Sequence, residues 1–504
     1  MEPLEAATPD GLPPKSAGGQ TASQVKQRAA AGLVVIGSRG VAILLIGFAS
    51  YAALARLLTP HQFGLIAIGL AFTAIIGLVA DGGLGGALIR RVEPPTRKEL
   101  QALTALQFGV AVVLALLTLG VGAFLGEAGM IAAIMTAAMP IVTLQMPGRI
   151  LLERSLSYRS LALLEIAQVL CYQVAAVALV VAGLGAWGVA IAWIIRALVG
   201  SLMMARLSPV GLVSPIFSWR LVRPIIGFGV RFQAANASAL VSEQGLNWTI
   251  ASVASVSTLG LWSLTRRLLE IPLLLIQTFG RVSFTSMSRL LELKQDCGRL
   301  IERAVGIAAV STGIALTGLT GSAPGLVPGI FGERWARSAE ALPGACLALA
   351  IAGSVGVATQ GYLYAVGDAS AVLRATMVQA VILLTVTVPL LPQVGVAGVG
   401  IGWLIAAVVE SVLLVRSTKK RLELRLAKSL IAPLSIGCAS ASVGWFLAQS
   451  GGADIRSGLV GGAASVTVYI VGLLAFRRAL LFDAVRFFAR SLRATRTELT
   501  AAQL

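Results

Sequence analysis

The sequence predicts an all-α integral membrane protein with about fourteen transmembrane helices. Of its 504 residues, 57% are hydrophobic and only 12% are charged, about half of the roughly 25% that is typical of a soluble domain. The apolar residues also gather in stretches long enough to cross a bilayer. Finally, the loops between these stretches alternate between many and few basic residues.

Apolar stretches of spanning length follow one another along the chain. Tight turns with Gly or Pro, such as 183–185 and 392–395, join several neighbours, as is typical of antiparallel helical hairpins. We expect the spans at 30–54, 63–88, 103–125, 130–150, 160–182, 186–207, 228–253, 259–282, 304–326, 342–366, 371–391, 396–415, 430–447 and 459–476.

The charge distribution predicts the orientation. The formal net charge is +18, from 40 Lys+Arg and 22 Asp+Glu. In a soluble protein this excess would indicate a nucleic-acid partner. Here the basic residues lie in short loops on one side, such as 90–98 and 416–428, so no nucleic-acid partner is expected. The positive-inside rule makes that side cytosolic, which predicts a multi-pass protein with both termini in the cytosol.

The two ends of the chain differ from the spans. Residues 1–28 are rich in Pro, Gly, Ser and Gln, lack the pattern of a signal peptide, and are expected to form a disordered cytosolic tail. Near the other end, five apolar residues share one helical face with arginines around the remainder; they are Leu480, Leu481, Val485, Phe488 and Leu492. We expect an amphipathic helix on the anionic inner leaflet, with a solvated tail as the alternative.

An internal repeat relates the sixth and twelfth spans. Matched residues lie 210 positions apart, as in Trp193 and Trp403 (403 − 193 = 210), and the matches begin with Gly185 and Gly395. A weaker match links 63–65 with 259–261. Chance similarity is the alternative, but Trp is a rare residue type and each segment is sixth in a block of six spans. We therefore expect two parallel six-helix lobes plus a terminal helix pair.

This organisation predicts the following division of the chain: a tail at 1–28, an N-lobe of helices 1–6 at 29–207, a cytosolic linker at 208–227, a C-lobe of helices 7–12 at 228–417, helices 13–14 at 418–476, and a cytosolic amphipathic tail at 477–504. Transporters built from parallel repeats bind their substrate between the lobes and alternate access by rocking.

Enzyme and metal chemistry find little support. The four cysteines lie far apart, and the single histidine, His61, stands beside a predicted loop. A disulfide framework, a metal site and histidine-based catalysis are therefore not expected. The longest outer loop, about 324–343, is too short to build a sugar-processing site, so a membrane polymerase or ligase is the least favoured function.

Polar residues inside the expected spans indicate a cavity, because intramembrane charges are costly and usually serve function. Spans one, two, seven and eight hold most of them, at positions that the repeat makes equivalent, so we expect them to converge on one central cavity. The expected substrate-binding residues are Arg39, Arg267, Arg266, Arg231, Asn236 and Asn247, and the expected coupling or counter-ion residues are Asp81, Glu243 and Glu270.

Alternatives stay open for several of these side chains. Arg39 lies near the middle of the first span, and could also snorkel towards an interface. Asp81 is either the counter-ion of Arg39 or a cap on a broken helix. Glu270 can form a purely structural pair with either arginine one turn earlier. Arg196 is a lone charge in the sixth span, which we interpret as lateral support for the cavity.

The balance of charges favours an anionic ligand. The expected cavity holds more arginines than acids, and guanidinium groups bind phosphate oxygens in a bidentate manner. A lipid-linked diphosphate fits this chemistry, whereas a cationic drug does not.

Several motifs resemble those of Wzx-type polysaccharide flippases, which belong to the multidrug/oligosaccharidyl-lipid/polysaccharide (MOP) exporter superfamily. The segments ARLLTPHQFGL at 55–65 and DGGLGGALIRR at 81–91 resemble the family most closely. Further matches lie at 259–264 through Pro272, at 281–284 with 288–290, and at 331–335. The likeness runs in order from about the first span to the twelfth.

The resemblance implies a MATE-like fold and a flippase that translocates undecaprenyl-diphosphate-linked oligosaccharide across the bacterial inner membrane by alternating access. It serves surface polysaccharide, lipopolysaccharide or exopolysaccharide biosynthesis. Cavity cations hold the diphosphate in such proteins, and Arg39 and Arg267 stand where these cations are expected. The implied partners are the lipid-linked oligosaccharide, membrane lipid and other polysaccharide assembly proteins, with no cofactor but coupling to H⁺ or Na⁺. The alternative is a MATE-like drug/cation antiporter, which predicts a cavity dominated by acids.

Overall fold

The computed structural model describes residues 22–503 except 271, 275, 277–286, 288–296 and 425. Every regular element among these residues is a helix, which confirms the all-α prediction for the described part of the chain. Contacts divide the chain into two units. Unit 1 comprises residues up to 58, 65–247 and those from 496 onward, and unit 2 comprises 59–64 and 248–495.

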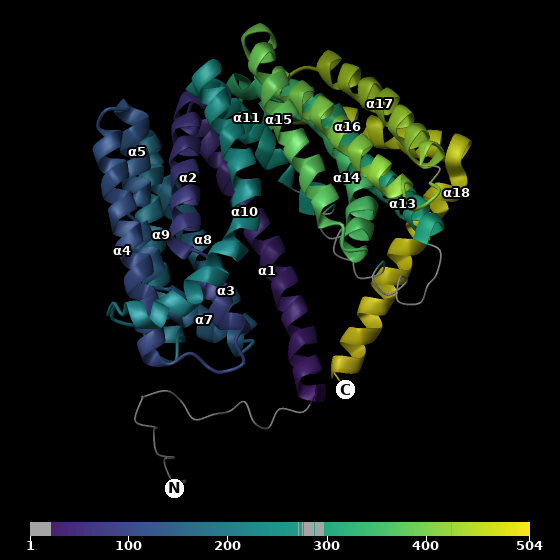
Figure 1. Ribbon diagram of the computed structural model, residues 1–504. Helices are drawn as coiled ribbons and strands as arrows, with labels where there is room; N and C mark the ends of the chain where they lie inside the picture. Colours follow the sequence, from purple (N-terminus) through teal and green to yellow (C-terminus); the bar gives the residue numbers. More distant parts are fainter. Residues whose placement is uncertain are drawn as a thin grey trace. The chain divides into compact units, whose positions relative to one another are not determined.

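Unit 1 is built around α8, which packs against both α1 and α9, while α4 packs against α5 and α6 (Figure 1). Its helices are α1 (Ala22–Leu57), α2 (Pro60–Asp81), α3 (Leu84–Arg90), α4 (Arg97–Gly122), α5 (Gly126–Thr136), α6 (Met139–Thr143), α7 (Met146–Arg154), α8 (Tyr158–Leu179), the π-helical turn η1 (Val180–Leu184), α9 (Gly185–Leu207) and most of α10 (Trp219–Val253). The first turn of α2 and the last turns of α10 belong to unit 2.

Unit 2 is built around α13, which packs against α14 and α17, and α16, which packs against α14 and α15. Its helices are α11 (Val256–Leu268), α13 (Cys297–Phe331), the 3₁₀ segment η2 (Glu333–Ala341), α14 (Leu342–Ala365), α15 (Ala369–Val394), α16 (Ala397–Lys419), α17 (Ala427–Ser450) and α18 (Ile455–Gln503).

The described residues contain 11 stretches that are long and apolar enough to cross a membrane. The difference from fourteen has two sources. The fifth and sixth expected spans are joined into one stretch, Tyr158–Leu207 of 50 residues, although Gly183 at φ 92° turns the chain between α8 and α9. The seventh and eighth, expected at 228–253 and 259–282, are not among the 11, and both ranges include side chains outside the described part.

The fourth span, expected as one helix at 130–150, is instead broken into α5, α6 and α7. Pro140 and Pro147 each stand in the first turn of a new helix. A proline lacks the backbone N–H that a continuous helix needs and is tolerated best in a first turn. The break brings the short helix α7 and its charged side chains into the interior of unit 1.

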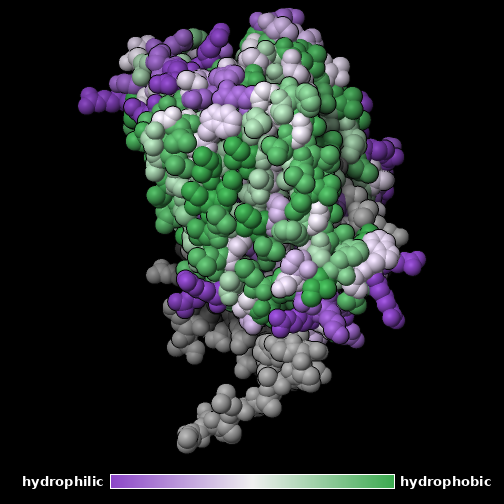
Figure 2. Space-filling model, turned by 90° about the vertical axis from the view of Figure 1, so that its left-hand side faces the viewer, coloured by the Kyte–Doolittle hydropathy of each residue, from purple (hydrophilic) through white to green (hydrophobic). Residues whose placement is uncertain are grey.

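The outer face over α4 and α5 is apolar, as lipid contact requires. Figure 2 shows a hydrophobic band on this side of the molecule with hydrophilic residues above and below it. Exposed large side chains of α4 contribute to the band, among them Val113, Leu116, Leu117 and Val121. Because a monomeric soluble protein rarely exposes so much contiguous apolar surface, the band indicates a membrane environment.

Glycines at equivalent positions support the internal repeat. Gly185 has φ 55° and ψ −135°, and Gly395 has φ 60° and ψ −138°. A Cβ at Gly188 would lie 2.9 Å from Leu179 Cβ, and one at Gly398 would lie 2.9 Å from Leu390 Cβ. The same turn and the same close helix approach therefore occur at both ends of the 210-residue offset.

The two ends of the chain differ in part from expectation. Helix α1 begins at Ala22, inside the range expected to be a disordered tail, and residues 1–21 lie outside the described part. Helix α18 breaks at Arg477 (φ −147°, ψ 39°), where the amphipathic tail was expected to begin. Beyond the break, Leu481 and Ala484 are buried in a cluster with residues of α13, and Asp483 pairs with Arg303 at 2.9 Å. This part of the tail thus packs on unit 2 through one face, while Val485 is exposed.

Candidate functional site

The interior of unit 1 contains a cluster of charges centred on Glu165 of α8. One carboxylate oxygen, Oε2, pairs with Arg39 Nη1 of α1 at 2.8 Å. The other, Oε1, pairs with Arg149 Nη2 of α7 at 2.8 Å. Three helices from different parts of the sequence therefore meet at one carboxylate. We call Arg39, Arg149, Arg196 and Glu165 the arginine cluster.

The fourth member, Arg196 of α9, lies against aromatic rings. Its Cζ is 4.7 Å from the centroid of Trp193 and 6.0 Å from that of Tyr172. The two rings meet edge to face at 5.4 Å. Arg196 also interacts electrostatically with Arg149 and Glu165. Cation–π contact offsets part of the cost of holding a guanidinium in an apolar environment.

Packing of α1 on α8 fixes the position of the cluster. Ser50 of α1 donates a hydrogen bond to Gln173 Oε1 of α8 at 2.7 Å, further along both helices than the Arg39–Glu165 pair. Two contacts along the same pair of helices set their register. Glu165 stands seven residues after the first residue of α8, which places it about 10 Å along the helix axis at 1.5 Å per residue.

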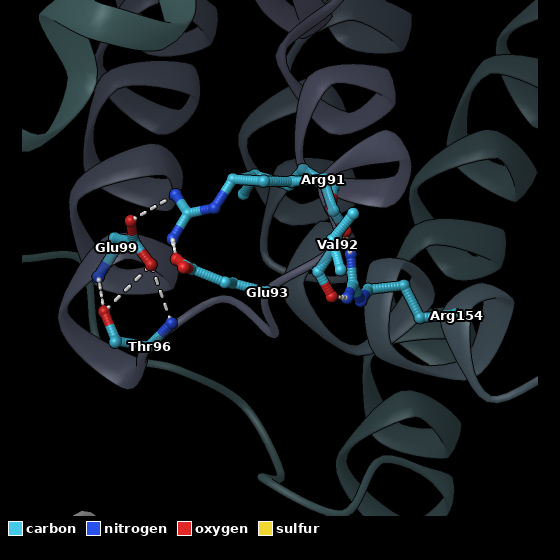
Figure 3. Close-up of polar contacts among 7 residues, drawn as sticks. Arg91, Val92, Glu93, Thr96, Glu99 and Arg154 are labelled. Atoms are coloured by element: carbon cyan, nitrogen blue, oxygen red, sulfur yellow. Dashed lines mark hydrogen bonds and ion pairs between the residues drawn. The ribbon is translucent and has the colours of Figure 1, made fainter. Parts of the chain in front are cut away.

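A second arginine of α7 anchors that helix. Arg154 donates hydrogen bonds to the backbone carbonyls of Leu88, Ile89, Arg91 and Val92 at 2.6 to 3.2 Å. Figure 3 shows this side chain reaching Val92, and it shows Arg91 turned towards Glu93 and Glu99. The carbonyls at the end of α3 lack helical partners of their own. Arg154 supplies their donors and so ties α7, the helix of Arg149, to α3.

The charge balance of the cluster is positive. Three guanidinium groups surround one carboxylate, which leaves an excess of two positive charges. The side chains are partly accessible, with exposed fractions of 28% for Arg39, 24% for Glu165 and 38% for Arg149. Intramembrane charges are costly without partners. An accessible cluster with excess cation is therefore suited to an anionic group of a ligand.

Asp81 does not pair with Arg39, which corrects one of the two expected readings. Its Oδ2 accepts a hydrogen bond from the backbone N–H of Gly83 at 3.1 Å, and Gln107 donates to its backbone carbonyl at 3.1 Å. Gly82 and Gly83 have φ of 53° and 68°, so the chain turns between α2 and α3. Asp81 caps this break, because the end of a helix leaves polar groups that need partners.

The expected site residues of the C-lobe form smaller contacts. Arg267 and Glu270 form an ion pair one helical turn apart, and Arg266 is partly buried beside them. Asn247 donates to Gln244 Oε1 at 3.0 Å. The side chain of Glu243 is exposed on α10. Arg231 and Asn236 also belong to α10, but their side chains lie outside the described part.

Sequence reasoning missed two members of the cluster. Glu165 lies in the fifth span, and Arg149 was assigned to a basic loop after the fourth. A usable signal exists in α8, where Glu165, Gln168 and Tyr172 recur at spacings of three and four on one helical face. The cluster also corrects the expectation that charges gather in spans one, two, seven and eight, since α7, α8 and α9 belong to spans four to six.

The cluster has no charged counterpart at the equivalent positions of the repeat. At the offset of 210 residues, Glu165 corresponds to Ala375 and Arg196 to Ala406, and both alanines are buried in unit 2. Unit 2 instead contains an apolar cavity of about 500 Å³. Its lining comes from α13, α14, α16, α17 and α18 and includes Thr317, Cys346, Leu404, Gly437 and Tyr469.

Metal chemistry finds no site in the described residues, where no group of three or more His, Cys, Asp or Glu side chains could hold an ion. The cluster can therefore act through hydrogen bonds and charge alone.

Comparison with known proteins places the chain among polysaccharide biosynthesis proteins. A family model described as "Polysaccharide biosynthesis protein" matches residues 53–340, more than half of the chain. The lipopolysaccharide biosynthesis protein WzxC of Escherichia coli (strain K12) is 23% identical over 334 residues, which are 63% of this chain and 64% of that protein. The succinoglycan biosynthesis transport protein ExoT of Rhizobium meliloti (strain 1021) is 23% identical over 305 residues, or 57% and 60%. The chain thus spans about three fifths of the length of these relatives.

Solved structures show the same fold. The lipid II flippase MurJ in an inward closed conformation matches with a TM-score of 0.68 and 12% identity, over 89% of this chain and all of that one. A multidrug resistance MATE family transporter of the MOP superfamily, in an inward-facing conformation, matches with a TM-score of 0.53 and 16% identity, over 75% and 96%. These neighbours confirm the MATE-like fold and the expectation of a transport protein rather than an enzyme. The chain belongs to the polysaccharide biosynthesis protein family and has the membrane fold of MurJ and the MATE transporters.

Proposed function

We propose that the protein is a flippase that translocates undecaprenyl-diphosphate-linked oligosaccharide across the bacterial inner membrane, by alternating access, for surface polysaccharide, lipopolysaccharide or exopolysaccharide biosynthesis. The observation that supports this most directly is the arginine cluster inside unit 1. Arg39 and Arg149 extend from two helices to one carboxylate at 2.8 Å each. This arrangement suits the oxygens of a diphosphate, which accept the same charge-assisted hydrogen bonds.

The apolar cavity of unit 2 supports a lipid-linked substrate. Its volume of about 500 Å³ and its largely aliphatic lining provide a surface for hydrocarbon rather than for sugar. A chain with a cationic cluster in one unit and an apolar cavity in the other has chemistry for both parts of a polyprenyl diphosphate.

The proposed topology has fourteen spans, two parallel six-helix lobes and both termini in the cytosol. It rests on the alternation of basic loops and on the matched glycines of α9 and α16. The lobe boundaries proposed are 29–207 and 228–417, followed by a helix pair at 418–476. The lobes would contribute a common cavity in which Arg231, Arg266, Arg267, Asn236 and Asn247 add contacts to the substrate.

Ion coupling is assigned to carboxylates of this cavity. We place it at Glu243, Glu270 and Asp81, with H⁺ or Na⁺ as the coupling ion. Other polysaccharide assembly proteins are the expected protein partners.

The second candidate is a MATE-like drug/cation antiporter, which the similarity to a MATE transporter favours. The excess of arginine over acid around Glu165 opposes it, because a cationic drug would be repelled. Expression in a drug-sensitive strain separates the two, since an antiporter raises resistance to cationic drugs and a flippase does not.

The flippase proposal is tested by complementation. In a strain that lacks the native protein, we expect Arg39→Ala and Arg149→Ala to reduce surface polysaccharide at least tenfold at equal protein level, because the diphosphate loses a charged partner. Arg159→Ala is the matched control: this arginine is exposed near the start of α8, and its loss should leave export unchanged. Full export by both folded cluster variants would refute the assignment of the diphosphate to this cluster.

A further inference from the structure

The carboxylate of Glu165 occupies the place that a phosphate group would take between the two arginines. Each of its oxygens faces one guanidinium, and the two distances are equal at 2.8 Å. Two oxygens of a tetrahedral phosphate can bridge two guanidinium groups in the same way. Glu165 and a phosphate therefore compete for the same N–H donors.

The donors around Glu165 exceed what one carboxylate can accept. A guanidinium has five N–H donors. Among the described residues, the buried Nε of Arg39 has no hydrogen-bond partner. Arg149 Nε lies 3.9 Å from Glu153 Oε1, beyond hydrogen-bond distance. A ligand with more oxygens than a carboxylate would satisfy donors that Glu165 leaves unpaired.

The charges of the cluster also match a diphosphate. Arg39, Arg149 and Arg196 contribute three positive charges and Glu165 one negative charge, which leaves +2. A diphosphate esterified at both ends bears two negative charges at neutral pH. With Glu165 released from the arginines but still nearby, the occupied cluster is close to neutral. Without Glu165, the arginines would face each other uncompensated before binding, which is strongly unfavourable inside a membrane.

We propose that Glu165 is a built-in competing anion, which holds Arg39 and Arg149 together before the substrate binds and reclaims them when it leaves. The inference rests on the flippase proposal and adds a release step to it. Because only the fraction of molecules with free arginines binds the ligand, the competing carboxylate weakens apparent affinity. The same competition accelerates release of the diphosphate, which a transporter needs in order to turn over.

The test measures binding and export in the same variants. Purified full-length protein is titrated with undecaprenyl diphosphate, and export is followed by complementation. Glu165→Gln keeps the shape of the side chain but removes its charge, so we expect a Kd about tenfold lower than in the native protein together with reduced export. A purely structural role for Glu165 predicts the reverse for binding, since displaced arginines would bind the diphosphate more weakly.

Glu153→Gln is the matched control for charge. Glu153 belongs to the same helix as Arg149 and interacts with it electrostatically, but at 3.9 Å it occupies none of its N–H donors. We expect its Kd to change by less than about threefold. An equal tightening in Glu153→Gln and Glu165→Gln would reduce the effect to long-range charge and overturn the proposal.

The outcomes separate this inference from the function itself. If the native protein does not bind undecaprenyl diphosphate, or if Arg39→Ala and Arg149→Ala bind it as the native protein does, both proposals fail. If binding requires both arginines but Glu165→Gln is no tighter, only the competing-anion proposal fails. Should Glu165→Gln not fold, Glu165→Asp replaces it. Its carboxylate is one methylene shorter and cannot reach both arginines, so its Kd should fall as well, and an unchanged Kd would again overturn the proposal.

Discussion

The two arginines of α7 use the same guanidinium chemistry for different purposes. Arg149 gives its donors to a carboxylate inside the unit, whereas Arg154 gives its donors to four backbone carbonyls at the end of α3. The rigid, planar fork of a guanidinium makes both arrangements possible, and a lysine ammonium would reproduce neither. The position of each arginine on the helix, five residues apart, decides which acceptors it meets.

Arg154 should be important for stability. In Arg154→Ala the carbonyls of the α3 end lose their donors, and we expect a loss of about 1–3 kcal/mol of unfolding free energy. Arg154→Lys should recover only part of it. The measurement is the thermal unfolding of purified protein in detergent, with Arg159→Ala as a control that unfolds like the native protein. Native-like unfolding of Arg154→Ala would mean that water replaces the guanidinium at these carbonyls.

At the scale of elements, helix ends outside the membrane are fixed by side-chain caps. Thr96 and Glu99 form a reciprocal capping box at the start of α4 (Figure 3). At the start of α15, Asp368 accepts hydrogen bonds from the hydroxyl of Ser370 and the backbone N–H of Ala371, and it pairs with Arg421 at 2.7 Å. These contacts, that of Ser370 first, hold the pKa of Asp368 below its ordinary value of 3.8.

The cap of α15 should make stability depend on pH. A lowered carboxyl pKa means that the contribution of Asp368 is fully present above its ordinary pKa and is lost as the pH falls through the lowered value. We expect Asp368→Asn to unfold at a lower temperature than the native protein at pH 7, with the difference vanishing in strong acid. Unfolding scans across pH measure this, with Glu423→Gln from the same loop as the control. A difference that persists in strong acid would assign the effect to packing instead of charge.

At the scale of the whole molecule, the two halves of the repeat share backbone features but differ in chemistry. Gly64 and Gly260, which stand 196 residues apart in the weaker match, illustrate the shared part. A Cβ at Gly64 would overlap the carbonyl oxygen of Val256, and a Cβ at Gly260 would overlap that of Pro60. Pro60 and Val256 are also 196 residues apart, so the two contacts within unit 2 are reciprocal, as a two-fold relation requires.

This reciprocal contact predicts intolerance to a single methyl group. Gly260→Ala and Gly64→Ala would each force backbone apart, and we expect losses of about 1–3 kcal/mol with reduced export. Gly109→Ala is the control, because a Cβ on this glycine of α4 meets nothing within 4 Å. Thermal unfolding and complementation measure the two effects. Stable, active Gly260→Ala protein would show that this helix contact relaxes easily.

The fold class, the membrane environment and the anionic nature of the ligand could be predicted from the sequence. Apolar length, loop charge and the periodic recurrence of residues such as Trp193 and Trp403 are local properties, so they are visible along the chain. The charge of Arg39 inside a span was equally visible, and it indicated a site correctly placed in α1. The broken fourth span was not predicted, because two prolines redirect helices only in the context of their neighbours.

Only the tertiary structure decided which charges meet. The sequence contains Arg39, Arg149 and Glu165 at separations of 16 to 126 residues, and no local pattern ranks Glu165 above Asp81 as the partner of Arg39. Packing of α1 on α8 and the turn into α7 bring the three side chains together. The physical reason is that helix periodicity is encoded locally, whereas the pairing of charges depends on which helix faces pack, and that is a property of the whole fold.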